Sequence, residues 1–242
     1  MSALSFSVVI PVKDEAANID KLLDEISAAT ESCSAFDVIA VDDGSSDDTL
    51  AVLRAYKQTH ALPLIILKNP HNLGQSTSIY LGVRQSQRDW IVTIDGDGQN
   101  DPADIPSLLA QAAAHPAAAM VAGQRAQRRD SWIKRISSRI ANNVRAGLLK
   151  DNTPDTGCGL KLIRRDILLA VPYFNHMHRF LPALVRRHGG TVLHVPVNHR
   201  HRTEGKSKYG TLDRLWVGIW DLMGVMWLMK RNRLPQTPPT VE

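Results

Sequence analysis

The sequence has little cysteine and lacks several short motifs that mark common nucleotide-binding proteins. Only two cysteines, Cys33 and Cys158, occur in 242 residues, so a disulfide scaffold is not expected and a reducing compartment fits best. Neither GxxxxGK[ST] nor GxGxxG is present. Readings of the chain as a P-loop ATPase or as a dinucleotide-dependent oxidoreductase therefore lose their main support.

A signal peptide and a membrane-spanning run are also not apparent. The first residues, MSALSFSVVIPVKDE, have no basic region and reach charged residues early, so we interpret them as the first strand of a cytoplasmic protein. The apolar stretch 215–229 contains Asp221 and is shorter than the roughly 20 residues that span a bilayer. Its three tryptophans and basic flanks favour a helix lying in a membrane interface, and a core or dimer-contact helix is the alternative.

Positively charged residues are scarce in the first half of the chain, and negatively charged residues are scarce in the second half. Residues 1–124 carry 7 Lys and Arg against 16 Asp and Glu, a net charge of −9. Residues 125–242 carry 22 against 8, a net charge of +14. This asymmetry predicts an acidic surface that could hold a cation and a basic surface that could face phosphates. Two solvated faces of opposite sign are the simpler alternative.

Apolar runs of strand length alternate with segments of helical periodicity. The runs are 6–12, 36–42, 63–68, 90–95, 117–123 and 191–197. This alternation predicts an α/β fold, Rossmann-like, with a mostly parallel sheet and flanking helices. In such sheets the ligand crevice lies beyond the carboxyl ends of the strands, so the residues after each strand are the candidates for a functional site.

The stretch IVTIDGDGQNDP at 91–102 places Asp95, Asp97 and Gln99 at alternate positions after an apolar run. A calcium loop starting at Asp95 would need glycine at its sixth position and glutamate at its twelfth, and these are Asn100 and Pro106. Alternate residues of an extended chain point the same way. The three oxygen-bearing side chains could therefore bind Mg²⁺ or Mn²⁺, although a solvated strand end is the more common meaning of such a pair.

Two further strand ends are acidic. VDDGSSDDT places Asp42 and Asp43 after the second expected strand, and IPVKDE places Asp14 and Glu15 after the first. Helix capping accounts for part of VDDGSSDDT. Three acidic strand ends converging on one crevice are difficult to explain by capping alone, and we expect them to surround a nucleotide.

The ordered series VVIPVKDEAANI, VDDGSSDDT, NLGQSTSI, TIDGDGQNDP and GQR resembles family-two glycosyltransferases with a GT-A fold. Three more segments, KRISSRIAN, DTGCGLKLIRRD and RTEGKSK, are similar to the polyprenyl-phosphate branch of that family, typified by dolichyl-phosphate mannose synthase. The resemblance covers roughly residues 6 to 210. It implies an inverting, metal-dependent transfer of a hexose-type sugar from a UDP- or GDP-sugar to a polyprenyl phosphate.

The resemblance also implies roles for individual residues. The donor's base and ribose would contact Pro11, Asp14, Glu15, Asp42 and Asp43, with Asp95 beside them, and the cation would be held by Asp95, Asp97 and Gln99. Groups acting on phosphates or in catalysis would be Asp97, Arg125, Arg202 and Lys208, and the acceptor phosphate would meet Lys134, Ser138, Arg202, Ser207 and Lys208. A lipid phosphate is already anionic, so no general base is assigned.

The chain departs from the family pattern at Lys13-Asp14, where Tyr-Asn is common, at Gln75, which replaces a frequent lysine, and at Lys134, where arginine is common. These differences leave open which nucleobase and which sugar the donor carries.

The expected organisation is a transferase domain at 1–210, an interfacial or packing helix at 211–233 and a disordered tail at 234–242. We expect a peripheral or monotopic enzyme on the cytoplasmic membrane face, with an oligomer possible.

Three alternatives stay open. Transfer to a soluble or glycan acceptor is one, although the Q-x-x-R-W string of processive synthases is absent. A non-catalytic module that binds nucleic acid or anionic membrane through the basic half is another, but its basic residues are not interleaved with aromatics, and no nucleic-acid partner is expected. Zinc binding by His176, His178, His194, His199 and His201 is a third; the NHRHR segment fits a basic, phosphate-facing surface better.

Overall fold

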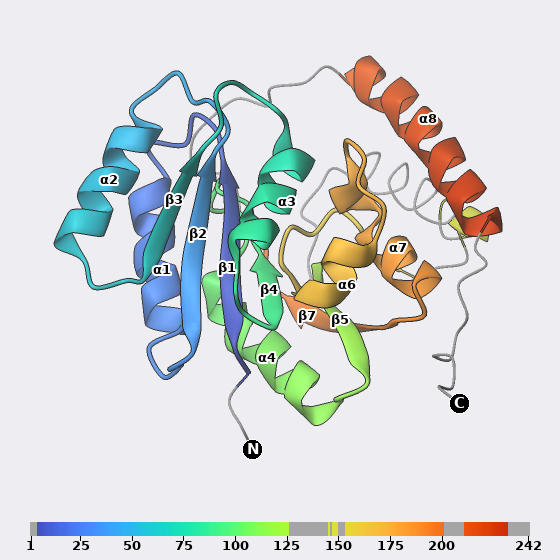
Figure 1. Ribbon diagram of the computed structural model, residues 1–242, viewed down its shortest axis with the longest axis horizontal. Coiled ribbons are helices and arrows are strands. Elements are labelled where there is room, and N and C mark those ends of the chain that lie inside the picture. The colour runs from blue at the N-terminus through green and yellow to red at the C-terminus, as the bar shows by residue number, and fades with distance from the viewer. Residues whose placement is uncertain (1–3, 126–144, 146, 150–152, 201–210, 232–242) are drawn as a thin grey trace, which may run out of the picture.

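Seven strands form one mixed sheet in the computed structural model, which describes residues 4–125, 145, 147–149, 153–200 and 211–231. The strand order is β3-β2-β1-β4-β6-β5-β7 (Figure 1). The strands are β1 (Phe6–Val12), β2 (Phe36–Asp42), β3 (Leu64–Lys68), β4 (Trp90–Thr93), β5 (Ala118–Arg125), β6 (Lys161–Arg164) and β7 (Thr191–Val197). All neighbouring pairs are parallel except those of β6, which runs antiparallel to β4 and β5.

The expectation of a mostly parallel α/β sheet is confirmed, with one strand missed. The six expected strands are all present, although the run 90–95 ends as a strand at Thr93 and the run 117–123 continues to Arg125. The additional strand is β6, which lies inside the segment DTGCGLKLIRRD. It fills the position between β4 and β5, so the sheet could not have been assembled from the six expected strands alone.

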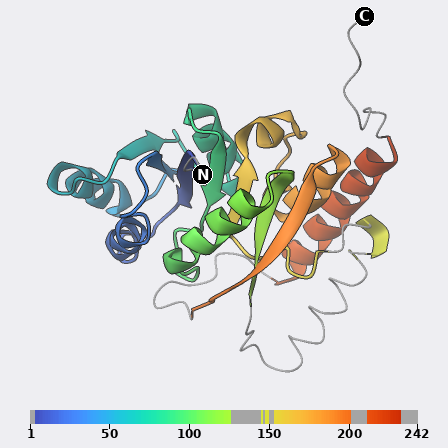
Figure 2. The same cartoon turned by 90° about the horizontal axis from the view of Figure 1, so that it is seen from below.

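Helices cover both faces of the sheet, as expected for strands with buried residues on both sides. They are α1 (Ile19–Ala29), α2 (Thr49–Thr59), α3 (Gln75–Gln85), α4 (Ile105–Ala114), α6 (Arg165–Ala170), α7 (Leu181–Arg187) and α8 (Thr211–Lys230), with short 3₁₀ helices η1 (Pro102–Asp104) and η2 (Met177–Arg179). Figure 1 shows α1 and α2 to the left of β1 and α6, α7 and α8 to the right. In Figure 2, α2 and α8 lie toward opposite sides of the molecule.

Two buried apolar clusters hold these layers together. Alternate residues of β1 belong to different clusters. Val8 and Ile10 pack with the apolar face of α1 in the first cluster, whereas Val9 packs with α3 in the second. The second cluster also receives residues from α6, α7 and α8, including the buried Val225. The sheet is therefore anchored on both faces, which fixes the loops at its carboxyl edge.

The helix expected near the C-terminus is present as α8. In the described part of the chain, no helix combines the length and apolarity needed to cross a bilayer. The expected tail at 234–242 lies outside the described residues, and the domain limits stay predictions.

Candidate functional site

The carboxyl ends of β1, β2 and β4 lie at one edge of the sheet. Parallel pairing sets Val12 beside Asp42, and the Asp43 amide donates to the Val12 carbonyl at 2.8 Å. On the other side of β1, the Ile94 amide donates to the Val9 carbonyl at 3.2 Å. The three acidic strand ends of the sequence accordingly occupy one edge, where crevices of open α/β sheets are found.

Asp95 is held closely by its surroundings. Its Oδ1 accepts a hydrogen bond from Gln75 Nε2 at 2.7 Å, and a side chain in place of the hydrogen of Gly159 would collide with its carboxylate. Burial, together with the negative charge of Asp97, raises the pKa of Asp95 to about 6 from an ordinary value of 3.8. Two carboxylates that are costly to ionise side by side form a place where a cation relieves the repulsion.

A buried lysine lies at the same edge of the sheet as this carboxylate. Lys161 is the first residue of β6, lies opposite Thr93 of β4, and is only 4% exposed. Its Nζ donates to the carbonyl of Cys158. Burial lowers the pKa of the Lys161 ammonium, while the charge of Asp95 acts in the opposite direction. Because β6 is antiparallel, the start of this strand reaches the edge where the other strands end.

A cavity of about 200 Å³ lies between α3, the end of β4, the start of β6 and η2. His178 lines it, and its Nδ1 is 2.8 Å from Ser76 Oγ. Burial, followed by the positive charge of Lys161, lowers the pKa of His178 to about 3, so this imidazole is neutral at physiological pH. The lining residues are Gln75, Ile79, Thr93, Asp95, Thr156, Gly157, Cys158, Gly159, Lys161, His178, Arg179 and Leu181.

Arg125, expected to act on phosphate, is part of a fork-to-fork ion pair. Its Nε and Nη2 donate to Asp155 at 2.7 and 2.8 Å, and its backbone amide donates to the same carboxylate. Asp155 is buried and also accepts from the Gly157 amide at 3.2 Å. The pair therefore fixes the segment leading to Gly159 against the end of β5, and bidentate geometry makes this attachment strong.

The residues expected to bind the nucleotide lie in the loops at this edge of the sheet. Their carboxylates accept different numbers of hydrogen bonds from the rest of the protein. Asp43 accepts from the side chain of Asn69 and from two backbone amides, at Leu73 and Gly74, each at 2.8 Å. This carboxylate organises the loop that leads into α3. Asp42 is buried and accepts from the Ser45 amide at 3.1 Å.

Pro11, Asp14 and Glu15 lie at and just beyond the end of β1. Pro11 is half-buried in the strand. Asp14 has a positive φ of 50° and accepts from the Ser46 amide at 2.7 Å, which joins the first loop to the second. Glu15 accepts from Asn18 at 2.8 Å at the start of α1. These bonds hold the first two loops in register at the site.

The turn after Asp97 has a well-defined local structure. Asp97 Oδ1 accepts from the Gln99 amide at 3.1 Å, and Asp101 Oδ1 accepts from Ala103, which caps η1 in the turn before Pro102. Asp101 and Glu25 also bind Arg200, both at 2.6 Å. Arg200 was expected in a basic, phosphate-facing surface, but it is neutralised here by two carboxylates.

Several predicted residues lie outside the described part of the chain: Lys134, Ser138, Arg202, Ser207 and Lys208. Their roles stay predictions. Three residues of the site were not singled out from the sequence: Asp155, Lys161 and Arg179. His178 was considered there only as a zinc ligand. Lysine inside the apolar run GLKLI is a signal for Lys161, because a charged residue in a short strand requires a partner.

The residues at the edge suit a hard divalent cation. In the described segments, no three side chains of His, Cys, Asp or Glu are grouped to hold a metal. The predicted set instead combines two carboxylates, Asp95 and Asp97, with the amide of Gln99, and oxygen donors of this kind leave positions for water and phosphate. The raised pKa of Asp95 is consistent with a carboxylate placed to share its charge with a cation.

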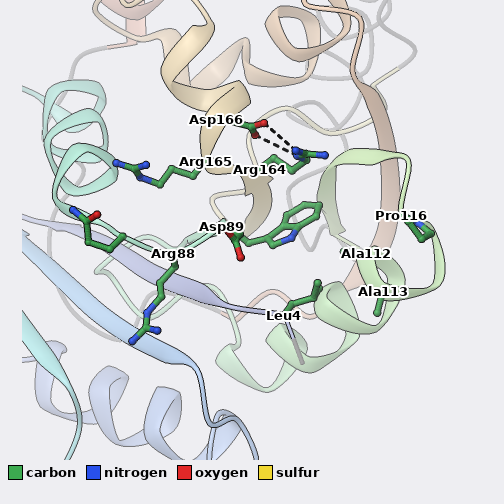
Figure 3. A pocket seen from close by; sticks show the side chains of 11 residues that line it. Leu4, Arg88, Asp89, Ala112, Ala113, Pro116, Arg164, Arg165 and Asp166 are labelled. Atoms are coloured by element: carbon green, nitrogen blue, oxygen red, sulfur yellow. Dashed lines mark hydrogen bonds and ion pairs between the residues drawn. The ribbon is translucent and has the colours of Figure 1, made fainter. Parts of the chain in front are cut away.

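A second, wider cavity of about 670 Å³ lies at the opposite edge of the sheet, near the start of β4 and the end of β6. Three arginines line it, but Figure 3 shows their guanidinium groups pointing in different directions. Arg88 pairs with Asp37 and Arg164 with Asp166, each at 2.9 Å. Arg165 Nε donates to the Val83 carbonyl at 3.2 Å. Each of the three arginines is thus engaged locally, and they do not converge on a ligand.

Comparison with known proteins identifies the family. Residues 7–171 match the model of glycosyl transferase family 2. The chain is 34% identical over 239 residues to dodecaprenyl-phosphate galacturonate synthase of Rhizobium johnstonii, covering 97% of this chain and 70% of that protein. It is 32% identical over 207 residues to undecaprenyl-phosphate 4-deoxy-4-formamido-L-arabinose transferase of Edwardsiella ictaluri, covering 85% of this chain and 63% of that protein.

Solved structures agree on the fold. Glucosyl-3-phosphoglycerate synthase of Mycobacterium tuberculosis, solved with Mn²⁺ and UDP, superposes with a TM-score of 0.72 at 18% identity, covering 96% of this chain and 81% of that one. Mannosyl-3-phosphoglycerate synthase of Rubrobacter xylanophilus gives a TM-score of 0.71 at 14% identity, covering 99% and 79%. At such identities the likeness establishes the fold alone, and the fold is GT-A. The chain belongs to glycosyl transferase family 2.

Proposed function

We propose that this protein transfers a sugar from a nucleotide diphosphate sugar to a polyprenyl phosphate, with the help of a divalent cation. The observation that carries the proposal is the position of Asp95 and Asp97 at the sheet edge where Asp14, Asp42 and Asp43 also lie. Such an edge can hold both a nucleoside and the cation that accompanies its diphosphate. The relatives named for polyprenyl-phosphate sugar transfer support the acceptor class.

The cation would be held by Asp95, Asp97 and Gln99. When bound, Mg²⁺ or Mn²⁺ supplies charge stabilisation for the departing diphosphate. The protein contributes a rigid support for this site, because Gln75 and Gly159 fix the Asp95 carboxylate from two sides. Fixed dipoles and charges lower the barrier more than mobile ones, since they need no reorganisation during the reaction.

The acceptor would be positioned by cations rather than activated by a base. A phosphate monoester carries negative charge at neutral pH and can attack without losing a proton to the protein. Arg125 is held in place by Asp155 at 2.7 Å. It would thus contribute a guanidinium group fixed in place, together with the cations of Lys134, Arg202 and Lys208 and the hydroxyl groups of Ser138 and Ser207. Correct positioning of two reactants accounts for a large part of such a rate enhancement.

Contact with a membrane would be made through α8. Its outward-facing apolar residues include Trp220 and Trp227, which are 68% and 60% exposed, while Val225 is buried against the domain. The Arg231 guanidinium lies 6.0 Å from the centre of the Trp227 ring. Exposed tryptophans next to cationic residues suit the headgroup region of an anionic bilayer. A peripheral position on the cytoplasmic membrane face follows as part of the proposal.

The test uses purified protein with Mn²⁺, a panel of UDP- and GDP-sugars and a short-chain polyprenyl phosphate. We expect a glycolipid product from at least one donor and none when EDTA removes the cation. Absence of glycolipid from every donor would refute the lipid acceptor. Release of a glycosylated soluble acceptor, such as phosphoglycerate, in the same panel would favour the alternative acceptor class.

A further inference from the structure

The residues that follow β7 run alongside the turn that carries the predicted cation ligands. The Arg200 amide donates to the Gln99 carbonyl at 2.8 Å. Next to this bond, Asn100 and His199 form an antiparallel bridge. The chain beyond β7 is therefore paired with the turn through the backbone, although the two segments lie far apart in the sequence.

The side chain of Arg200 fastens this pair of segments to a helix of the core. Its Nη2 donates to Asp101 Oδ1 and its Nη1 donates to Glu25 Oε2, each at 2.6 Å. Glu25 lies on α1, whose apolar face, including Ile26, is buried. Short hydrogen bonds between a guanidinium and carboxylates are among the stronger ones in proteins. Through Arg200, the turn is tied to an element that is fixed by its packing.

Hydrogen bonds, rather than packing around its glycine, hold the turn itself. Gly98 has a positive φ of 70°, and a Cβ added there would meet no atom within 4 Å. The Gln99 amide donates to Asp97 Oδ1 at 3.1 Å, and the Gln99 carbonyl accepts from Arg200. A small divalent cation such as Mg²⁺ requires nearly ideal octahedral geometry, so ligands on such a turn depend on the residues that support it.

We propose that Arg200 is a positioning residue for the cation site, because it holds Asp97 and Gln99 in the arrangement that binds the cation. This inference rests on the proposed function and adds to it a residue that acts through the turn. The phosphate-facing role expected for Arg200 from the sequence predicts a different result, since loss of Arg200 would then weaken binding of the acceptor phosphate. A positioning role predicts weaker cation binding and unchanged binding of the acceptor.

The experiment compares Arg200→Met with Arg88→Met. Arg88 is a matched control, because its side chain is 36% exposed against 37% for Arg200, and it pairs with Asp37 at 2.9 Å at the opposite edge of the sheet. Binding of Mn²⁺ is measured by electron paramagnetic resonance without acceptor, first alone and then with UDP or GDP. We expect Arg200→Met to raise the Kd of Mn²⁺ about tenfold and Arg88→Met to leave it unchanged, while urea unfolding shows similar losses of stability in both.

The transfer assay separates positioning from phosphate binding. In Arg200→Met, the Mn²⁺ concentration that gives the half-maximal rate should rise by the same factor as the Kd. Saturating Mn²⁺ should restore kcat, and the KM for the polyprenyl phosphate should stay at the wild-type value. An unchanged Kd of Mn²⁺ would overturn the inference, and so would a raised acceptor KM that saturating Mn²⁺ does not reverse. If Arg200→Met does not fold, Glu25→Gln should raise the Kd roughly twofold to fivefold.

Failure of this inference and failure of the proposed function give different results. A wild type that binds Mn²⁺ but forms no glycolipid would refute the proposed function, while the ratio of the Kd values would still decide the role of Arg200. A wild type that forms glycolipid beside an Arg200→Met variant with an unchanged Kd would refute only the positioning role. Absence of Mn²⁺ binding by the wild type in every condition would refute the cation site, and this inference with it.

Discussion

Replacing Asp95 by asparagine should stabilise the cation-free protein while abolishing its activity. The pKa of Asp95 is about 6 in the folded chain against an ordinary 3.8. A carboxyl whose pKa is raised on folding stabilises the fold in its protonated form. That contribution is fully present below about pH 4 and is lost as the pH rises through about 6.

The magnitude follows from the two pKa values. Ionising Asp95 at neutral pH costs the folded state about 3 kcal/mol relative to the unfolded chain. Asparagine cannot ionise, and its carbonyl oxygen can still accept from Gln75, so most of this cost should disappear. For a chain of this size, about 3 kcal/mol corresponds to an increase in Tm of roughly 6 to 12 °C.

The assay is thermal and urea unfolding in EDTA at pH 4.5, 5.5 and 7.5. Asp95→Asn should exceed wild type clearly at pH 7.5 and by much less at pH 4.5, and Glu31→Gln, which neutralises an exposed carboxylate, should track wild type throughout. Added Mn²⁺ should raise the Tm of wild type but not of Asp95→Asn. Equal stability of the two proteins at pH 7.5 in EDTA would refute the reasoning about Asp95.

Three further predictions concern other parts of the chain. Asp97→Ala should lower glycolipid formation at least a hundredfold with little change in Tm; retained turnover would remove Asp97 from the cation site. Asp43→Ala leaves three donors near Asn69 and Gly74 without their acceptor, so urea unfolding should show a loss of roughly 2 to 4 kcal/mol, and a loss below about 1 kcal/mol would contradict the anchoring role. Replacing Trp220 and Trp227 together by serine should weaken sedimentation with anionic vesicles about tenfold or more; unchanged binding would show that α8 is not the membrane contact.

Most of the fold could be predicted from the sequence because apolar runs and helical periodicity alternate clearly. The strand 6–12 and the strand 36–42 were located to the residue. The missed strand, Lys161–Arg164, has only four residues and begins with a charged side chain. Such a segment gives too short a pattern to distinguish a strand from a loop.

The candidate site, like the fold, could be predicted only in part. Acidic residues that follow parallel strands can be found by reading the ends of the apolar runs, and Asp42, Asp43 and Asp95 were found so. Partners that approach from distant segments cannot: Asp155 meets Arg125 across 30 positions, and Gln75 meets Asp95 across 20. Nothing in the sequence indicated that Arg200 would pair with Glu25 and Asp101 instead of facing phosphate.

The reversed direction of β6 explains why the basic component of the site was the harder one to predict. In a parallel sheet every strand delivers its last residues to the ligand edge, and here acidic residues end or closely follow β1, β2 and β4. The antiparallel β6 delivers its first residue, Lys161, to the same edge, opposite Thr93 of β4. Gly159, just before it, lets the chain pass directly against the Asp95 carboxylate. A single inverted strand thus brings the buried Lys161 to an edge where acidic strand ends also lie, and the metal-bound, negatively charged donor that we propose would meet side chains of both kinds there.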